Sequence, residues 1–389
     1  MTRRALITTA IVCVTTVISH SIGRSVYGLL LSAIKDDFGL TNAQAGRPSS
    51  GIFVLYVIGV LVVVVASPRF EPIAIMRTAV AFSVAGLIIT ATASGLGMLT
   101  VGVSLVGGAG AGIWMTAPVL ATEYVSERRR GVIIGALTSS IGLANIAFGI
   151  GTSAWRRASN DDQLWRPIWW VALAFTAIVL VALTTVARFA KTDRVGSGAL
   201  DLGIIRRIPH WQQVTIAYAL FGGMSAGFGT FIVKAIEEHG GLNSETSPLI
   251  FSAMGIAGML AAPAAGAWSD SVGRIFVMRC TLVLLAAANF AVAAGGPTLV
   301  VGGAILYSAG ASAFPTLIAT YVRDSLDNRS FSQALSIMTI LFSIMAAILP
   351  TLMGVIADAT SSFGWPYLLT ALMPTAALMA LAGIRGRQV

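Results

Sequence analysis

Hydrophobic positions along this chain form long, continuous runs rather than short alternating stretches. A helix needs about 20 apolar residues to cross a hydrocarbon core about 30 Å thick. Runs of this kind, bounded by charged residues, Gly, Pro or Asn, predict twelve membrane-spanning helices: 6–34, 45–66, 73–94, 98–122, 131–152, 167–188, 211–235, 247–267, 275–294, 297–321, 332–357 and 366–384. Barrel strands would alternate apolar with polar residues, so the expected fold class is an all-α membrane protein.

The composition agrees with a surface that faces lipid. The chain has 389 residues, of which 56% are hydrophobic and only 11% charged. Soluble domains carry about 25% charged residues, because their surface must meet water. The net charge of +9 would suit nucleic acid if it formed one basic patch. The basic residues lie instead in short clusters between the apolar runs, so we expect a bilayer partner and no nucleic acid.

The distribution of Lys and Arg predicts the orientation. With the N-terminus inside the cell, eighteen of the 25 Lys and Arg residues fall in cytoplasmic segments and five fall outside. The inverted topology would break the positive-inside rule. We therefore expect a multi-pass protein of the cell inner (plasma) membrane with both termini cytoplasmic. Four tryptophans near the outer end of the fifth and sixth runs suggest an aromatic belt: Trp155, Trp165, Trp169 and Trp170.

The two halves of the chain repeat each other at an offset of about 200 residues. Segment 24–39 aligns without a gap on segment 225–240, which places Gly28 on Gly229 and Gly39 on Gly240. Parallel repeats of this kind place a solute site between the halves, near the bilayer midplane. We expect two pseudo-symmetric six-helix bundles, residues 1–189 and 211–389, joined by a cytoplasmic linker, residues 190–210.

The turn between the eighth and ninth runs reads Gly266-Ala-Trp-Ser-Asp270-Ser-Val-Gly273-Arg274. Asp270 can interact with a helix N-terminus or a nearby arginine, and Gly273 permits a tight turn that a side chain would block. The segment closely resembles the loop motif G-x-x-x-D-x-x-G-R of the major facilitator superfamily, in the place where that family has it. The resemblance covers the whole chain and implies a transporter of two six-helix bundles. It also implies that this loop fastens helices on the cytoplasmic side in one access state.

The chain departs from the family pattern in three places. In the first-half counterpart of the motif, residues 66–72, Pro68 stands where the family has aspartate and Glu71 where it has glycine. The Gly-Pro pair that drug–proton antiporters of the family carry in helix five is missing from residues 142–149. The arginine that many proton-coupled members carry in helix four is missing from residues 103–106. The last two departures weaken a drug-export function.

Arg24 is a charge inside an apolar run. An arginine near a bilayer centre costs about 2.5–3.5 kcal/mol on insertion scales, so it is rarely there without a partner. His20 lies one turn before it and Tyr27 nearly one turn after it, so the three are expected to share a face. No acidic residue lies in the middle of any run. Our hypothesis is that Arg24 binds a substrate carboxylate, that Tyr27 orients it, and that His20 carries a proton.

These residues also have structural interpretations. Arg24 would be structural if it bonded backbone carbonyls or extended outward along its own helix. His20 would be structural if it only bonded a neighbour. Lys234 has Glu237 and Glu238 three and four residues later, which is typical of an ion pair at the membrane interface.

Other candidates for a cavity are polar or aromatic residues within the runs. Each is more typical of packing or of a hydrogen bond between helices than of ligand binding. The stripe Met338, Phe342 and Met345 is interpreted first as packing and second as an apolar cavity wall. The candidates are Trp114, Asn145, Tyr307, Asn289 and Gln333, of which we assign Trp114, Asn145 and Tyr307 to substrate binding.

Several chemistries have no matching motif. The three histidines (His20, His210 and His239) are far apart and lack metal-ligand spacing, and Cys13 and Cys280 lie in apolar runs. A phosphate-binding glycine loop with its lysine is missing, which argues against ATP drive. No paired acid and base is seen. We expect no metal, no cofactor and no enzymatic activity.

The sequence therefore predicts a monomeric secondary transporter that works by alternating access and moves a small organic anion, with a proton as the candidate co-substrate in symport. One alternative is a multidrug or metabolite efflux transporter of the same superfamily. An acidic cavity residue would favour cationic substrates. Another alternative, of a different class, is a membrane receptor that retains the transporter fold, although no soluble output domain is visible.

Overall fold

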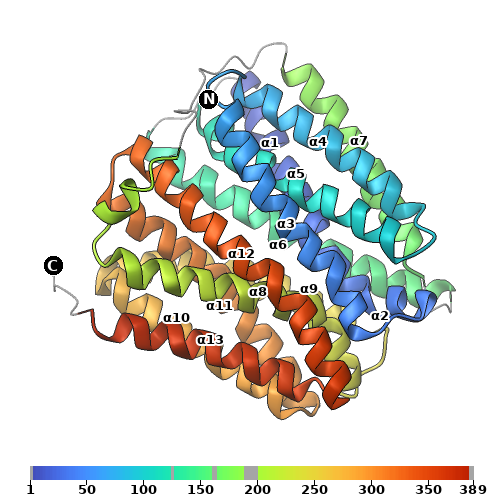
Figure 1. The fold of residues 1–389 in the computed structure, drawn as a ribbon. Helices are drawn as coiled ribbons and strands as arrows, with labels where there is room; N and C mark the ends of the chain where they lie inside the picture. Colours follow the sequence, from blue (N-terminus) through green and yellow to red (C-terminus); the bar gives the residue numbers. More distant parts are fainter. Residues whose placement is uncertain (1–2, 124–126, 160–163, 188–199, 385–389) are drawn as a thin grey trace.

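The computed structural model of this protein describes residues 3–123, 127–159, 164–187 and 200–384. No strand occurs in these ranges. Twelve of their helical spans are long and apolar enough to cross a membrane, which confirms the predicted number (Figure 1). The helices are α1 (Arg3–Val17), η1 (Ile18–Ser25), α2 (Val26–Phe38), α3 (Asn42–Ala66), α4 (Pro72–Ala91), α5 (Leu96–Thr122), α6 (Glu127–Ser159), α7 (Arg166–Val186), η2 (Ile204–Arg207), α8 (Trp211–Glu238), α9 (Ser247–Val272), α10 (Arg274–Ala294), α11 (Pro297–Ser325), α12 (Asn328–Thr360) and α13 (Gly364–Ala382).

The first membrane span is interrupted by a wider turn. It consists of α1, η1 and α2, and η1 is a π-helix, in which the N–H of Val26 bonds to the carbonyl of Ser21, five residues earlier. π-helical turns are rare and frequently lie at functional sites. The sequence predicted an uninterrupted helix here, so the π-helix is a feature that the hydrophobic pattern did not reveal.

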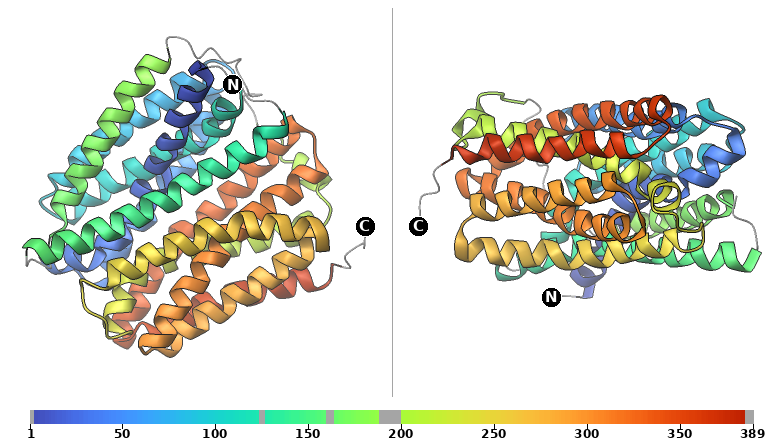
Figure 2. Two further views of the ribbon diagram at one scale, coloured as in Figure 1. Left: turned by 180° about the vertical axis from the view of Figure 1, so that it is seen from behind. Right: turned by 90° about the horizontal axis from the view of Figure 1, so that it is seen from below.

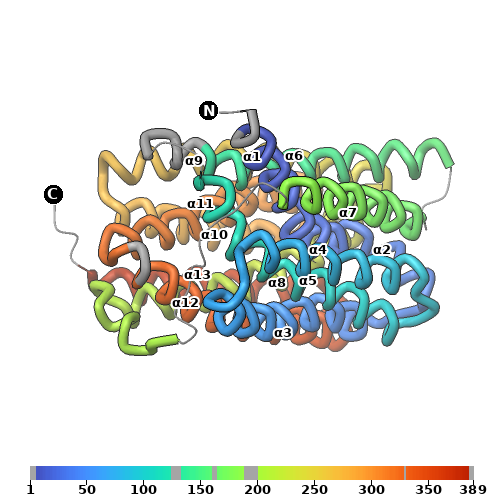
Figure 3. The backbone as a smooth tube through the Cα atoms, turned by 90° about the horizontal axis from the view of Figure 1, so that it is seen from above, coloured from blue at the N-terminus to red at the C-terminus, as the bar shows by residue number. Residues whose placement is uncertain are grey.

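Helices pack mainly within each half of the chain. In the first half, α5 packs against α3 and α4, and in the second half α11 packs against α9 and α10. Seen from above, the second half (green-yellow to red) lies beside the first half (blue to green) (Figure 3). Residues 190–199 of the predicted linker (190–210) lie outside the described residues. Its described part includes the short helix η2, whose Ile204 and Ile205 are buried.

Three helix pairs make most of the contacts between the halves: α3 with α12, α6 with α9 and α2 with α8. In the view from behind, α6 (teal to green) and α9 (yellow) lie close at the end of the bundle away from the two termini and diverge toward the other end (Figure 2). We call the first end the seam end and the second the open end. The turns after α2, α8 and α12 lie at the seam end, and the turns after α3 and α9 lie at the open end.

Two details of the fold differ from the sequence prediction. The fifth span continues to Ser159 rather than 152, because Ser153 and Arg156 are bonded across to the second half at residues 244 and 245. Trp165 and Trp169 are fully buried rather than part of an exposed belt. The indole of Trp165 donates a hydrogen bond to Asp37 at 3.0 Å, which explains its inward position.

Candidate functional site

A cavity of about 330 Å³ lies between the two halves of the chain. Small-molecule sites in proteins typically enclose about 300–1,000 Å³, so this cavity suits a small solute. Both halves supply its walls. The lining residues are His20, Arg24, Ser25, Ser49, Ile52, Phe53, Tyr56, Trp114, Ile141, Asn145, Tyr218, Phe221, Ser225, Ala226, Gly229, Thr230, Ile232, Phe251, Met254, Gly255, Tyr307, Ser308, Ala311, Pro315, Thr339 and Phe342.

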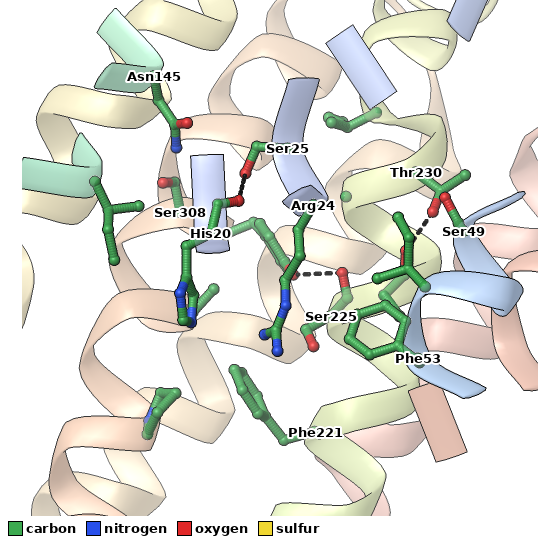
Figure 4. Close-up of a pocket in the computed structure, with 18 of the residues that line it drawn as sticks. His20, Arg24, Ser25, Ser49, Phe53, Asn145, Phe221, Ser225, Thr230 and Ser308 are labelled. Atoms are coloured by element: carbon green, nitrogen blue, oxygen red, sulfur yellow. Dashed lines mark hydrogen bonds between the residues drawn. The ribbon is translucent and has the colours of Figure 1, made fainter. Parts of the chain in front are cut away.

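The π-helix η1 supplies the polar centre of this cavity. Both His20 and Arg24 belong to η1, and their side chains extend into the same space, toward Phe221 of α8 (Figure 4). The hydroxyl of Ser25 donates to the carbonyl of His20 at 3.3 Å. This bond joins the side chain of the last residue of η1 to the backbone of the same turn.

Arg24 is the charged group of the cavity. Its guanidinium carbon lies 4.3 Å from the ring centre of Tyr56 and 5.2 Å from that of Phe53, so the cation rests on two aromatic rings of α3. Cation–π contacts of this kind contribute about 2 kcal/mol when desolvated. The Nε atom is buried and has no hydrogen-bond partner. Among the described lining residues none is Asp or Glu, so the protein supplies no counter-ion there.

His20 lies beside Arg24 on the wall formed by the first half. Its Nδ1 shares a hydrogen bond of 2.7 Å with the hydroxyl of Ser19, and its ring centre lies 4.3 Å from that of Trp114. These two contacts fix the ring orientation. The second ring nitrogen, Nε2, has no hydrogen bond among the described residues and belongs to a side chain that lines the cavity.

The structure brings together most of the predicted site residues. Trp114, Asn145 and Tyr307 line the same cavity as Arg24 and His20. Asn145 accepts a hydrogen bond from Ser21 of η1, and the Tyr307 hydroxyl donates to the carbonyl of Ser225 at 3.3 Å. The first of these bonds ties α6 to the polar centre of the cavity, while the second fixes a ring in the wall of the second half.

Tyr27 is not among the residues that line the cavity. It is fully buried, and its hydroxyl donates to the carbonyl of Ala45 at 2.6 Å, which joins α2 to α3. The shared face with Arg24 assumed a regular α-helix. The π-helix ends at Ser25 and changes the rotation between the two residues. We therefore leave Tyr27 out of the site proposed below.

Three other sequence candidates lie outside the lining. Asn289 accepts a hydrogen bond from Thr370 at 2.7 Å and joins α10 to α13. Gln333 is not among the lining residues. Lys234 forms an ion pair of 2.6 Å with Glu238, as the structural interpretation of its spacing predicted.

Sequence reasoning missed most of the aromatic wall. Tyr56 and Phe53 of α3 and Tyr218 and Phe221 of α8 line the cavity, and none of them was singled out. The spacing of Ser49, Phe53 and Tyr56, at positions i, i+4 and i+7, does indicate one helix face. It does not indicate whether that face points to the cavity or to lipid.

At the seam end, polar side-chain contacts join the two halves closely. The carboxylate of Glu237 on α8 accepts hydrogen bonds from Ser32 on α2 and, at 2.6 Å, from Ser247 on α9. The guanidinium of Arg156 on α6 lies 3.8 Å from the same carboxylate. The Glu237 carboxylate therefore connects helices of both halves. The Glu237 side chain is 14% exposed, and that of Arg156 is only 1% exposed.

A second polar contact closes the seam between α3 and α12. Asp358 accepts hydrogen bonds from the backbone N–H groups of Asn42 and Ala43, at 2.9 and 2.8 Å. These N–H groups belong to the first turn of α3, where helices leave donors unpaired and a negative charge is favourable. A carboxylate from the second half thus caps a helix of the first half.

Toward the open end α6 separates from α9. Gly135, Gly142 and Gly149 are spaced by seven residues and lie on one stripe of α6. A Cβ at Gly149 would collide with Pro248 and Ser252 of α9, and one at Gly142 would lie 2.9 Å from the Cβ of Met259. A Cβ at Gly135 would meet nothing within 4 Å. The close contact with α9 therefore ends between Gly142 and Gly135.

This architecture, with a cavity between two bundles that touch at one end, is that of a known family. A family model described as Major Facilitator Superfamily matches residues 13–240 and 214–387. The chain belongs to the major facilitator superfamily.

The chain is similar to a transporter over part of its length and to solved structures over almost all of it. The uncharacterized transporter YgaY, from Escherichia coli K12 and O157:H7, is 27% identical over 154 residues, which span 40% of this chain and 38% of YgaY. Among solved structures, the nucleoside transporter NupG gives a TM-score of 0.76 at 14% identity, covering 99% of this chain and 100% of NupG. A bacterial homolog of the human lysosomal transporter Spinster, in an inward-facing and unoccupied conformation, gives 0.66 at 13% identity, covering 97% and 94%. At these identities the likeness to the solved structures shows the fold alone.

The superfamily loop motif lies at the open end, between α9 and α10. Gly273 has a φ of 96°, a conformation that favours glycine. Arg274 pairs with Asp270 and, at 3.1 Å, with Asp324 near the end of α11, and it also donates to the carbonyl of Gly266. The predicted motif residues are therefore assembled in one cluster. In this conformation the cluster connects three helices of the second half.

Proposed function

We propose that this superfamily member is a secondary transporter that carries a small organic anion by alternating access. One observation supports it most strongly: Arg24 lies in the cavity between the halves, and none of the described lining residues is acidic. A partly buried cation without a protein carboxylate is costly, and a substrate carboxylate would reduce that cost. The planar guanidinium suits a planar oxyanion, since it can donate two parallel hydrogen bonds.

Alternating access is supported by the difference between the two ends of the interface. The seam end is closed by Glu237 and Asp358, whereas α6 and α9 separate toward the open end. Rocking of two six-helix bundles, residues 1–189 and 211–389, about the cavity would exchange these ends. We propose that the open end is cytoplasmic, with both termini inside and the protein in the cell inner membrane; the positive-inside rule supports this orientation. One chain contains the complete cavity, so we propose a monomer.

His20 is the proposed proton carrier. It lines the cavity, four residues from Arg24, and its imidazole titrates in the physiological range when unperturbed. Its Nδ1 is engaged by Ser19, so a proton would be exchanged at Nε2. Proton-coupled uptake of an anion would then be symport. We expect His20→Gln to bind the anion but to lose accumulation driven by a pH gradient.

Two other functions are weaker. Efflux of a cationic compound is disfavoured, because Arg24 would repel the cation and the described lining offers no carboxylate to attract it. Efflux of a neutral metabolite leaves Arg24 without a role. A receptor function has no specific feature to support it. The direction of anion transport follows from the gradients, so uptake and exchange share the same site.

Uptake into proteoliposomes tests the proposal. Labelled carboxylates are offered to the wild type, Arg24→Ala and Arg24→Lys, with Arg206→Ala, an exposed arginine of η2, as the matched control. Charge-assisted hydrogen bonds contribute about 1.5–3 kcal/mol, so Arg24→Ala should weaken binding by roughly 10- to 100-fold. Arg24→Lys should recover part of this, and Arg206→Ala should transport normally. Normal carboxylate uptake by a folded Arg24→Ala protein would exclude the anion site.

A further inference from the structure

Aromatic side chains are concentrated around the cavity. Phe, Trp and Tyr make up 8% of the chain, yet eight of the 26 lining residues are of these types: Phe53, Tyr56, Trp114, Tyr218, Phe221, Phe251, Tyr307 and Phe342. If the site bound only a compact, strongly hydrated anion, this apolar surface would leave much of the anion without hydrogen-bond partners. The composition of the cavity walls therefore indicates the chemistry of the uncharged part of the substrate.

Five of these rings lie in one group around Arg24. Tyr56 and Phe53 of the first half contact the guanidinium directly. Phe342 of α12 has its ring centre 6.3 Å from Phe53, 5.1 Å from Tyr218 and 6.0 Å from Phe221. The group is thus continuous across the two halves, and Arg24 is at its first-half edge.

The two halves offer different chemistry to a bound solute. The first half supplies the cation, Arg24. The second half supplies Tyr218, Phe221 and Phe342, with Ser225 and Thr230 as neutral hydroxyl groups, and no charged residue among its described lining positions. An acid with only a carboxylate and a short chain would therefore interact mainly with the first half. A substrate that draws the two halves together around the cavity must interact with both of them. A ligand shifts an equilibrium between two conformations only as far as it binds one conformation more tightly than the other.

We infer that the carried anion is an aromatic monocarboxylate, with its carboxylate on Arg24 and its ring among Phe53, Phe221 and Phe342. This inference depends on the proposed function and narrows its substrate class. Single charge follows from Arg24 being the one cationic side chain among the described lining residues other than the titratable His20. A second carboxylate would be buried without a partner. Planarity follows from ring walls contributed by three helices, since aromatic pairs contribute about 0.5–1.5 kcal/mol beyond the area they bury.

Binding to the purified protein tests this inference with five probes: benzoate, cyclohexanecarboxylate, benzamide, acetate and phthalate. Benzoate and cyclohexanecarboxylate share charge and approximate size but differ in planarity. Since the ring interaction corresponds to about 1 kcal/mol, we expect benzoate to bind roughly fivefold to tenfold more tightly. Acetate, which has no ring, benzamide, which has no charge, and phthalate, which has a second carboxylate, should each bind more weakly than benzoate.

Variants of the second half separate the ring from the charge. Phe342→Leu and Phe221→Leu keep Arg24 and should reduce the preference for benzoate over cyclohexanecarboxylate to about one. Phe290→Leu, on the exposed face of α10 at 43% exposure, is the control and should leave the preference unchanged. Thermal unfolding of each variant checks that it is folded, and agreement between the two cavity variants guards against local misfolding of either.

The outcomes distinguish this inference from the proposed function. Equal binding of benzoate and cyclohexanecarboxylate, both dependent on Arg24, would overturn the aromatic substrate and leave the anion site standing. Tighter binding of phthalate than benzoate would overturn the single charge. If no carboxylate bound, or if benzamide bound as well as benzoate, the proposed anion function itself would be wrong. A benzoate preference that needs both Arg24 and Phe342 is the result we expect.

Discussion

The two ends of the interface between the halves are built from different groups. At the seam end, Glu237 and Asp358 bond across the halves, and on the same side of the cavity Gly28 of α2 packs directly on the backbone of Gly229 in α8, a lining residue. At the open end, Arg274 and Asp270 form the main polar cluster, and their described partners belong to the second half. Contacts between the halves are thus concentrated at one end, while the other end is held together within a half.

This difference suggests what has to change during transport. The seam contacts are small-residue packing and polar bonds with part of their surface exposed, such as Glu237 at 14%. Such contacts can be replaced by water when the halves separate, whereas a large apolar interface could not be opened at a similar cost. The seam is therefore suited to break, and the loop cluster of Arg274 is suited to stay intact while its half moves.

Bulk at Gly28 should have the largest effect on the seam. A Cβ there would overlap the carbonyl of Gly229 and lie 3.2 Å from that of Thr230. Overpacking costs about 1–3 kcal/mol, so Gly28→Val should lower the seam-closed population by up to about 100-fold. Maleimide labelling of Ser50→Cys, in a background without Cys13 and Cys280, measures this, since Ser50 bonds Thr351 across the seam at 2.8 Å. Labelling should become faster.

Gly151→Ala is the matched control for Gly28→Val, because a Cβ at that position of α6 meets nothing within 4 Å. Its labelling rate should equal that of the starting protein. Equal rates for Gly28→Val and Gly151→Ala would mean that the contact between α2 and α8 does not hold the seam closed.

Loss of the Glu237 charge should have the next largest effect. Glu237→Gln keeps a similar shape but removes the negative charge beside Arg156, which is 1% exposed. Disturbing a buried charged hydrogen bond costs about 1–3 kcal/mol, so labelling of Ser50→Cys should rise by about tenfold. Glu71→Gln removes an exposed carboxylate in the turn after α3, at the open end, and serves as the control. A rise of similar size in Glu71→Gln would contradict a specific role for Glu237.

The cap supplied by Asp358 should have a smaller effect. Asp358→Ala leaves the N–H groups of Asn42 and Ala43 to water, and loss of a helix cap costs about 1 kcal/mol. We expect labelling of Ser50→Cys to increase about fivefold. Asp36→Ala removes an exposed carboxylate of α2 and serves as the control. If both variants labelled alike, the cap would not contribute to seam closure.

Much of the fold could be predicted from the sequence because lipid imposes a simple rule on it. Each span must be apolar for about 20 residues, so the twelve runs were visible, and the repeat followed from the alignment of Gly28 on Gly229. The structure gives that alignment a physical meaning. The two glycines meet where the backbones of α2 and α8 come too close together for a side chain at Gly28.

The site could be predicted only where a polar residue interrupts an apolar run. Arg24 and His20 were found for this reason, since their positions are costly without a function or a partner. Phe342 was interpreted mainly as packing, because an aromatic residue in an apolar run carries no sign of its surroundings. Phe82 and Phe276 lie in similar runs and are 55% and 51% exposed on the outer surface. Only the packing of helices separates these cases.

A substitution in the loop motif, residues 266–274, is expected to have the smallest effect. It tests most directly whether the two ends of the interface have separate roles. Arg274→Gln removes the pairs with Asp270 and Asp324, which are 65% and 55% exposed. Pairs with exposed partners contribute about 1 kcal/mol at most, so the unfolding temperature should fall by about 2 °C. The labelling rate of Ser50→Cys should not change, because the described contacts of the Arg274 side chain lie within the second half.

Arg69→Gln provides the control for Arg274→Gln at the pseudo-equivalent turn of the first half. Pro68 and Glu71 replace the motif residues there, and Arg69 forms no side-chain hydrogen bond or ion pair among the described residues. Its unfolding temperature should therefore match the wild type. If Arg274→Gln changed seam labelling as much as Asp358→Ala does, the cluster would act between the halves. The separation of roles between the two ends would then be wrong.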